Sequence, residues 1–246
     1  AVAAALQGGK RLFYVGAGTS GRLGALDASE LPPTFGISPD RVQAILAGGP
    51  DAFFQSREGA EDDREAGARS LIDRGVRDGD VVFGITASGR TPFVLGALEQ
   101  ASSLGAFPML LSCNPHRPPA PCVRLAIDLA TGPEIVAGST RLKAGTATKL
   151  VLNLLSTIAM IRTGRVRDNL MVNVQPISEK LRYRALHLVM DLVPCGEEEA
   201  LGRLERTGWR VTAAVDLAKP TGNSDQPADE ESGGRPCRGQ SERSSQ

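Results

Sequence analysis

Five short apolar runs, separated by longer segments with helical periodicity, constrain the fold of this chain more than any other feature. The two central runs are almost continuously apolar instead of alternating with polar residues, which is typical of strands in a parallel sheet covered by helices on both faces. The pattern therefore predicts an α/β fold with a doubly wound, mainly parallel five-stranded sheet. The expected strands are Arg11–Val15, Val42–Leu46, Val81–Ile85, Pro108–Ser112 and Arg124–Leu129.

The character of the sequence changes after Ser139. A long apolar pattern over residues 144–161 predicts a buried helix, and residues 166–174 read as a linker. Three short amphipathic patterns follow and predict a small C-terminal three-helix subdomain. They cover Ser178–Leu192, Glu197–Thr207 and Val211–Ala218.

Beyond Pro220 the chain has no aliphatic residue larger than Ala, so it is expected to be disordered. The expected domains are residues 1–165, 166–219 and 220–246. The alanine-rich stretch at the N-terminus reads as the inside of a helix, which predicts that the first domain is truncated there.

The charge balance and the scarcity of metal-binding side chains exclude several function classes. The chain carries 28 basic and 28 acidic residues without a basic block, so neither nucleic acid nor an anionic membrane is an expected partner. No apolar run is expected to approach the ~20 residues that span a bilayer. With two His and four Cys that form no CxxC pair, no metal site and a reducing, cytoplasmic location are expected.

The first expected strand leads into Gly16-x-Gly18-x-x-Gly21, the literal pattern of a dinucleotide-binding turn. That pattern also needs an acidic residue near the end of the second strand, to bind the ribose. Asp51 comes about ten residues too late for this role. A dinucleotide-dependent dehydrogenase is therefore a disfavoured alternative.

Three loops rich in Ser and Thr follow strands or precede helices, and two of them repeat Ser-Gly-Arg directly after a strand. Hydroxyl groups and free amides at helix N-termini suit a phosphate better than a dinucleotide. The alternative is that these residues only cap their helices, and the cations, Arg141 included, could equally be surface charges. The candidate binding residues are Thr19, Ser20, Gly21, Arg22, Ser88, Gly89, Arg90, Thr91, Ser139, Thr140 and Lys143.

Glu30 stands directly before Leu31-Pro32-Pro33, where the double proline is expected to end the first long helix. A carboxylate at a helix C-terminus faces the negative end of the helix dipole, which favours its protonated form. Such a group is a sensible acid catalyst. The alternative is an ordinary exposed glutamate.

Several long blocks resemble the N-acetylmuramic acid 6-phosphate etherases, which contain a sugar isomerase (SIS) domain. The blocks include "GAGTSGRLGALDASELPPTFG", "ITASGRTPFVLGAL", "SCNP" and "GPEIVAGSTRLKAGTATKLVLN", and the resemblance runs from about Gly9 to about Ala218. It implies a homodimeric lyase without a cofactor, acting on a sugar 6-phosphate that carries a D-lactyl ether at C3. The implied products are N-acetylglucosamine 6-phosphate and D-lactate.

The resemblance also implies the roles of two acids. It assigns Glu30 as the acid that protonates the departing lactyl oxygen, and Glu61 as the base that removes the C2 proton. Nothing but the resemblance selects Glu61, because it lies in an acidic run that is most simply a solvated helix face.

A geometric difficulty accompanies these roles. An unbroken helix from Ser20 to Glu30 separates its ends by about 15 Å, which is more than one sugar spans between its phosphate and its ether oxygen. The helix is therefore short or bent, or Glu30 serves a site bounded by another subunit. The second option fits a homodimer with its active site near the interface.

Two further alternatives share the SIS fold. One is a non-catalytic sensor resembling the animal glucokinase regulatory protein, which would bind a sugar phosphate and regulate a partner enzyme. The resemblance implies that this regulator lacks the acid of "DASE", which this chain has at Glu30. The other is an aldose–ketose isomerase, which needs a base but no acid for a leaving group.

Overall fold

A computed structural model describes residues 1–217, and the predicted tail at 220–246 lies outside these residues. Five strands form one sheet in the order β2-β1-β3-β4-β5, and every neighbouring pair is parallel. The predicted doubly wound α/β fold is therefore confirmed. The strands are β1 (Leu12–Gly16), β2 (Val42–Leu46), β3 (Val81–Thr86), β4 (Phe107–Ser112) and β5 (Leu125–Asp128).

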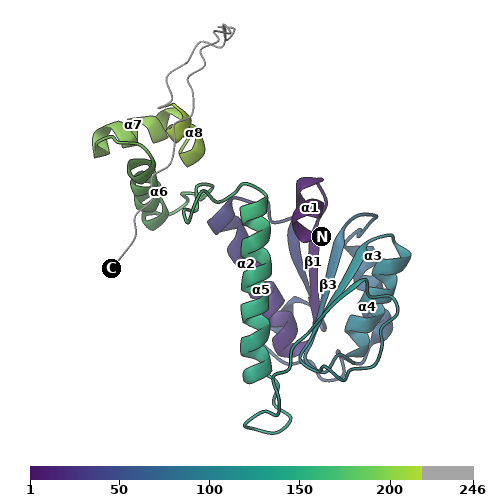
Figure 1. The fold of residues 1–246 in the computed structure, drawn as a ribbon. Coiled ribbons are helices and arrows are strands. Elements are labelled where there is room, and N and C mark those ends of the chain that lie inside the picture. The colour runs from purple at the N-terminus through teal and green to yellow at the C-terminus, as the bar shows by residue number, and fades with distance from the viewer. Residues whose placement is uncertain (218–246) are drawn as a thin grey trace, which may run out of the picture.

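Helices cover both faces of this sheet (Figure 1). Leu12 and Tyr14 of β1 belong to the apolar core beneath α1, α2 and α5, whereas Phe13 and Val15 belong to the core beneath α3 and α4. A buried strand with apolar residues on both faces satisfies both layers at once. The helices are α1 (Val2–Gln7), α2 (Gly18–Phe35), α3 (Arg64–Asp73), α4 (Pro92–Ser103) and α5 (Lys143–Arg162), with a short 3₁₀ helix η1 (Pro50–Phe53).

The expectation that the double proline ends the first helix at Glu30 is wrong. Helix α2 continues through Pro32 and Pro33 to Phe35 and ends at Gly36, whose left-handed φ of 61° allows a tight C-terminal turn. Contacts from outside the helix hold its last turn. The amide of Gln175 donates to the carbonyl of Pro33, and the Arg165 guanidinium donates to that of Phe35 at 2.8 Å.

Three helices near the C-terminus share a separate apolar cluster. Leu186 and Val189 of α6 (Glu179–Leu192) pack with Leu204 of α7 (Glu197–Arg206) and Val215 of α8 (Val211–Asp216). The structure thus contains the expected three-helix subdomain. The exact boundaries at 165 and 219 stay a prediction.

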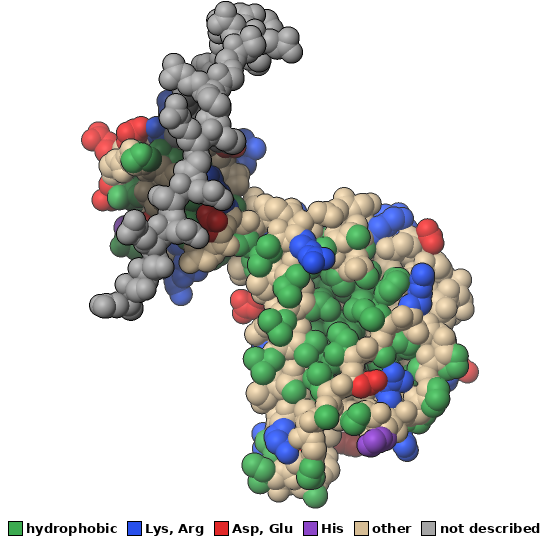
Figure 2. Space-filling view, viewed as in Figure 1, with side chains coloured by type: hydrophobic (Ala, Val, Ile, Leu, Met, Phe, Trp, Pro, Cys, Tyr) green, Lys and Arg blue, Asp and Glu red, His purple; other side chains and the backbone are tan. Residues whose placement is uncertain are grey.

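Helix α5 has an exposed apolar stripe. Leu150, Leu154 and Ile158 recur every four residues and are 59%, 61% and 49% exposed, and Figure 2 shows hydrophobic side chains gathered on this face. Contrary to the sequence expectation, α5 is long and apolar enough to cross a membrane by length and composition, with a mean hydropathy of 1.4. Length and composition alone are weak evidence for a membrane span, because core helices of globular proteins meet the same criterion.

Candidate functional site

The glycines of the first loop allow α2 to pack directly against the sheet. A Cβ on Gly21 would lie 2.3 Å from Leu46 Cδ1 and 2.5 Å from the carbonyl oxygen of Gly16. Both distances are far below van der Waals contact. The glycine spacing that resembles a dinucleotide turn therefore has a packing reason in this chain, whatever ligand the loop binds.

The N-terminus of α2 opens at the carboxyl edge of the sheet. Its N-cap residue, Ala17, offers no side-chain cap. The amides of Gly18, Thr19 and Ser20 donate no hydrogen bond to any group within residues 1–217. Free amides together with the positive end of the helix dipole favour an anion here.

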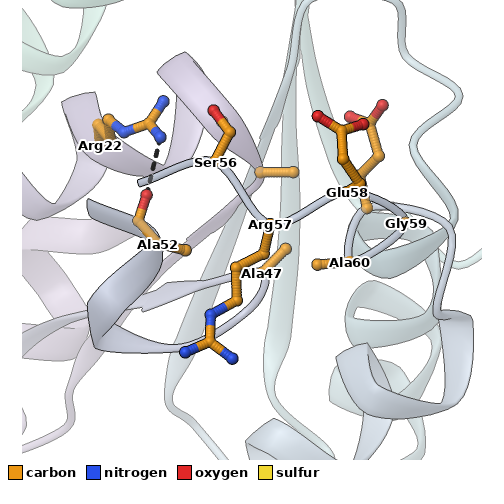
Figure 3. Close-up of a pocket in the computed structure, with 11 residues that line it drawn as sticks. Arg22, Ala47, Ala52, Ser56, Arg57, Glu58, Gly59 and Ala60 are labelled. Atoms are coloured by element: carbon orange, nitrogen blue, oxygen red, sulfur yellow. Dashed lines mark hydrogen bonds between the residues drawn. The ribbon is translucent and has the colours of Figure 1, made fainter. Parts of the chain in front are cut away.

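A pocket lies beside this helix N-terminus and is called the edge pocket below. Gly18, Arg22, Ser56, Glu58 and Glu61 are among the residues that line it. Figure 3 shows that the carboxylate of Glu58 and the guanidinium of Arg57 extend to opposite sides of the loop that carries them.

Arg22 lines the edge pocket, but two of its three side-chain nitrogens already donate to backbone carbonyls. Its Nε donates to the carbonyl of Phe53 at 2.7 Å, and Nη2 donates to that of Ala52 at 2.8 Å. Figure 3 shows the second bond. Arg22 therefore fixes η1 against α2, and only Nη1 has no hydrogen bond within the described residues.

Glu61 lies on a turn, so the interpretation of its acidic run as a helix face is wrong. Helix α3 begins only at Arg64, with Asp63 as its N-cap. The carbonyl of Glu61 accepts the amide of Phe93, in the first turn of α4, at 3.0 Å. This bond anchors the backbone of Glu61 to α4, while its side chain is exposed at the edge pocket.

The second Ser/Thr loop, Ser88–Thr91, is tightly organised. Thr86 Oγ1 contacts Thr91 Oγ1 at 2.7 Å, and Ser88 Oγ accepts the amide of Arg90 at 3.2 Å. Gly89 has a φ of 72°, and a Cβ there would lie 2.7 Å from two carbons of Arg117, so a larger residue would not fit. The Ser88 side chain itself is exposed.

The third loop differs, because a carboxylate of the chain itself occupies its helix N-terminus. Glu134 accepts the amide of Lys143 at 2.9 Å and that of Ala144 at 3.0 Å. The hydrogen bond from Ala144, followed by that from Lys143, lowers the pKa of Glu134. Ser139 and Thr140 therefore border a helix end that already carries an internal anion.

The structure brings the three loops to the same edge of the sheet. A Cβ on Gly145 would lie 3.5 Å from Thr19 Cγ2 and 3.6 Å from the carbonyl oxygen of Thr140, which joins the first loop to the third. Asn114 follows β4, and its side-chain amide donates to the carbonyl of Ser88 at 3.2 Å. The "SCNP" segment thus supports the second loop through its asparagine.

Glu30 is far from this edge. It lies twelve residues after Gly18 in one unbroken helix, about 18 Å away along the axis. The option of a short helix is therefore wrong, and the argument that places Glu30 at a helix end does not hold. Glu30 instead lines a second depression between α2 and α5, called the α2–α5 groove, together with Asp27, Lys149, Asn153 and Ser156.

Asp27 is a buried carboxyl at the base of this groove that sequence analysis missed. It is 3% exposed and accepts hydrogen bonds from Tyr14 Oη at 2.8 Å and from Ser156 Oγ at 3.1 Å. Burial raises the pKa of Asp27, and the charge of Glu30 raises it further, while the two hydrogen bonds and Lys149 lower it. Its position three residues before Glu30, one helical turn away, is the signal that could have identified it.

Within residues 1–217, no group of three or more His, Cys, Asp or Glu side chains is arranged to hold a metal ion. Two separated sets of polar groups lie among the described residues. One is the edge pocket with Glu61, and the other is the α2–α5 groove with Glu30, Asp27 and Lys149.

Residues 1–102 match the family model of the glucokinase regulatory protein N-terminal SIS domain. Among solved structures, a phosphoheptose isomerase from Francisella tularensis is 18% identical, covers 65% of this chain and 81% of its own, and has a TM-score of 0.47.

Sequence relatives are much closer. The N-acetylmuramic acid 6-phosphate etherase of Symbiobacterium thermophilum is 54% identical over 214 residues, which are 87% of this chain and 71% of the relative. The protein of the same name from Mesorhizobium japonicum is 52% identical over 86% of this chain and 69% of its own length. This chain belongs to the N-acetylmuramic acid 6-phosphate etherase family.

Proposed function

We propose that this protein is a carbon–oxygen lyase that cleaves the D-lactyl ether of N-acetylmuramic acid 6-phosphate. Its products are N-acetylglucosamine 6-phosphate and D-lactate. The observation that carries this proposal is the 54% identity to a protein named for this etherase activity, over 87% of this chain. The open N-terminus of α2 beside Glu61 supports it, because a phosphate and a C2 proton could meet an anion site and a base there.

The proposed reaction starts from the open-chain sugar, whose C2 proton is acidic because it is adjacent to the aldehyde. Glu61 takes this proton, the electron pair forms a C2–C3 double bond, and the C3–O bond breaks. Glu30 gives a proton to the departing lactyl oxygen. Water then adds at C3 and C2 regains a proton, so the sugar product and D-lactate balance the substrate plus water.

The proposed phosphate site consists of the α2 N-terminus and the Ser88–Thr91 loop. The three amides at the start of α2 supply donors without partners in the described residues, and Ser88 adds an exposed hydroxyl. Neither the proton transfers, the elimination and the water addition nor the binding of the phosphate requires a cofactor in this scheme. Ser139, Thr140 and Lys143 border the site from the third loop.

We also propose a homodimer in which Glu30 serves the edge pocket of the partner subunit. Two features support it. The length of α2 keeps Glu30 about 18 Å from the edge of its own subunit. In addition, the exposed stripe of Leu150, Leu154 and Ile158 runs next to the groove that contains Glu30, and a contiguous exposed apolar surface favours a protein interface.

Incubation with N-acetylmuramic acid 6-phosphate and an assay for D-lactate test the proposed reaction. The expected result is one D-lactate for each N-acetylglucosamine 6-phosphate. The match of residues 1–102 to the glucokinase regulatory protein domain leaves a sensor as the second candidate, which the etherase relatives do not favour. Tight sugar-phosphate binding without D-lactate release would favour that candidate and overturn the lyase. A cytoplasmic location stays a prediction, which fractionation of the source cells would test.

A further inference from the structure

The α2–α5 groove contains a cation that the proposed reaction has not used. Lys149 is the sole Lys or Arg among the described residues that line this groove. Its ammonium donates to Asn153 Oδ1 at 2.5 Å, one helical turn further along α5. This bond holds the ammonium on the face of α5 that borders the groove.

The charge of Lys149 is not neutralised by a salt bridge. Within residues 1–217 it takes part in no ion pair. The nearby carboxyl of Asp27 has both oxygens occupied by Tyr14 and Ser156. Asn153 uses one of the three N–H donors of the Lys149 ammonium, so the other two are available to another anion.

The substrate of the proposed reaction carries such an anion close to the bond that breaks. In the lactyl ether, one carbon separates the ether oxygen from the carboxylate. An acid that protonates this oxygen therefore has the carboxylate beside it. Since Glu30 and Asp27 are themselves carboxyl groups, the lactyl carboxylate needs a cation there to offset like-charge repulsion.

We propose that Lys149 binds the carboxylate of the D-lactyl group and so makes the α2–α5 groove the specificity site for the leaving group. This inference rests on the proposed function. Asn153 orients the ammonium, and Glu30 lies on the opposite wall of the groove, within reach of the ether oxygen when the carboxylate pairs with Lys149. The sugar and its phosphate remain at the edge pocket of the partner subunit, as in the proposed homodimer.

The test compares two substrates with the full chain. One is N-acetylmuramic acid 6-phosphate, and the other is the 3-O-ethyl ether of N-acetylglucosamine 6-phosphate, which lacks only the carboxylate. Lys149→Met should lower kcat/KM for the lactyl ether by about 10- to 100-fold, the usual effect of losing a charged hydrogen bond. The same variant should leave kcat/KM for the ethyl ether within about threefold of wild type. Lys149→Arg should restore part of the kcat/KM lost on the lactyl ether.

Arg162→Met is the matched control, because it removes an exposed cation from the same helix outside the groove. Arg162→Met should leave kcat/KM unchanged for both substrates. Hydrogen exchange at C2 should also persist in Lys149→Met, since that step belongs to Glu61. An equal loss on both ethers, or no loss on either, would overturn the role of Lys149. A wild-type chain that cleaves neither ether would overturn the proposed function instead, and this inference with it.

Discussion

The edge pocket and the α2–α5 groove are built by different means. At the edge pocket, loops and a close glycine contact present backbone amides, and Glu61 lies on a turn fixed through its carbonyl. In the groove, two helix faces present side chains over the buried carboxyl of Asp27. Backbone amides suit any phosphate, whereas a set of side chains can distinguish one leaving group from another. The proposed reaction would therefore divide binding of the sugar phosphate and departure of the leaving group between two different surfaces.

The largest expected effects come from removing each acid. Glu61→Gln and Glu30→Gln should each lower D-lactate release by about 10²- to 10⁴-fold, the usual contribution of a general acid or base. The variants should differ in deuterium oxide, where Glu30→Gln still exchanges the C2 hydrogen and Glu61→Gln does not. Nuclear magnetic resonance of the recovered substrate measures this exchange. If Glu61→Gln exchanged the C2 hydrogen at the wild-type rate, Glu61 would not be the base.

Mixing these two inactive variants tests whether the two surfaces meet across a dimer. If Glu30 serves the partner's edge pocket, random exchange gives mixed dimers with one intact site, and activity should return to about a quarter of wild type. Mixtures that stay inactive after verified subunit exchange would place both acids in one subunit's site. A wild-type mass of one chain by light scattering would also contradict the dimer.

A smaller effect is expected from the hydroxyls at the edge. Ser88→Ala should raise KM by about tenfold with little change in kcat, because a hydrogen bond to a charged phosphate is lost. Ser139→Ala should change KM less, since Glu134 already occupies the neighbouring helix N-terminus. Steady-state kinetics of both variants make the measurement. An unchanged KM in Ser88→Ala would exclude this serine from the phosphate site.

The smallest expected effect is a pair of opposite pH dependences in stability. The pKa of Glu134 is lowered in the folded state, so its contribution is present above its unfolded pKa and is lost as pH falls through the folded value. The pKa of Asp27 is raised, so wild type loses stability as pH rises from the unfolded to the folded value. Urea titrations measure the free energy of unfolding. As pH rises, this free energy should increase for wild type relative to Glu134→Gln and decrease for wild type relative to Asp27→Asn. If the two stability differences changed with pH in the same direction, the prediction would be contradicted.

The fold was predictable because its apolar runs have the length and continuity of buried parallel strands, and the observed strands lie within two residues of the expected ones. The end of α2 was not predictable, since proline usually terminates a helix. Here contacts from Arg165 and Gln175, at least 130 residues away along the sequence, sustain the last turn.

Prediction of the site was limited in the same way. Residues adjacent to strand ends, such as Ser88, could be expected at the edge from the parallel topology alone. The helix-capping role of Glu134 could not be foreseen, because a nine-residue separation from Lys143 gives no periodic signal. The sequence likewise does not distinguish Lys149 from an ordinary surface cation, because the groove that it lines exists only where α5 packs beside α2.

The way the last turn of α2 is held has a consequence for the order in which the molecule assembles. The turn that follows Glu30 receives its stabilising contacts from residues 165 and 175, which leave the ribosome long after α2 does. Contacts between such distant residues form late, because closing a long loop has a high entropic cost. During synthesis, the acid-bearing end of α2 is therefore expected to mature only after most of the sheet has formed.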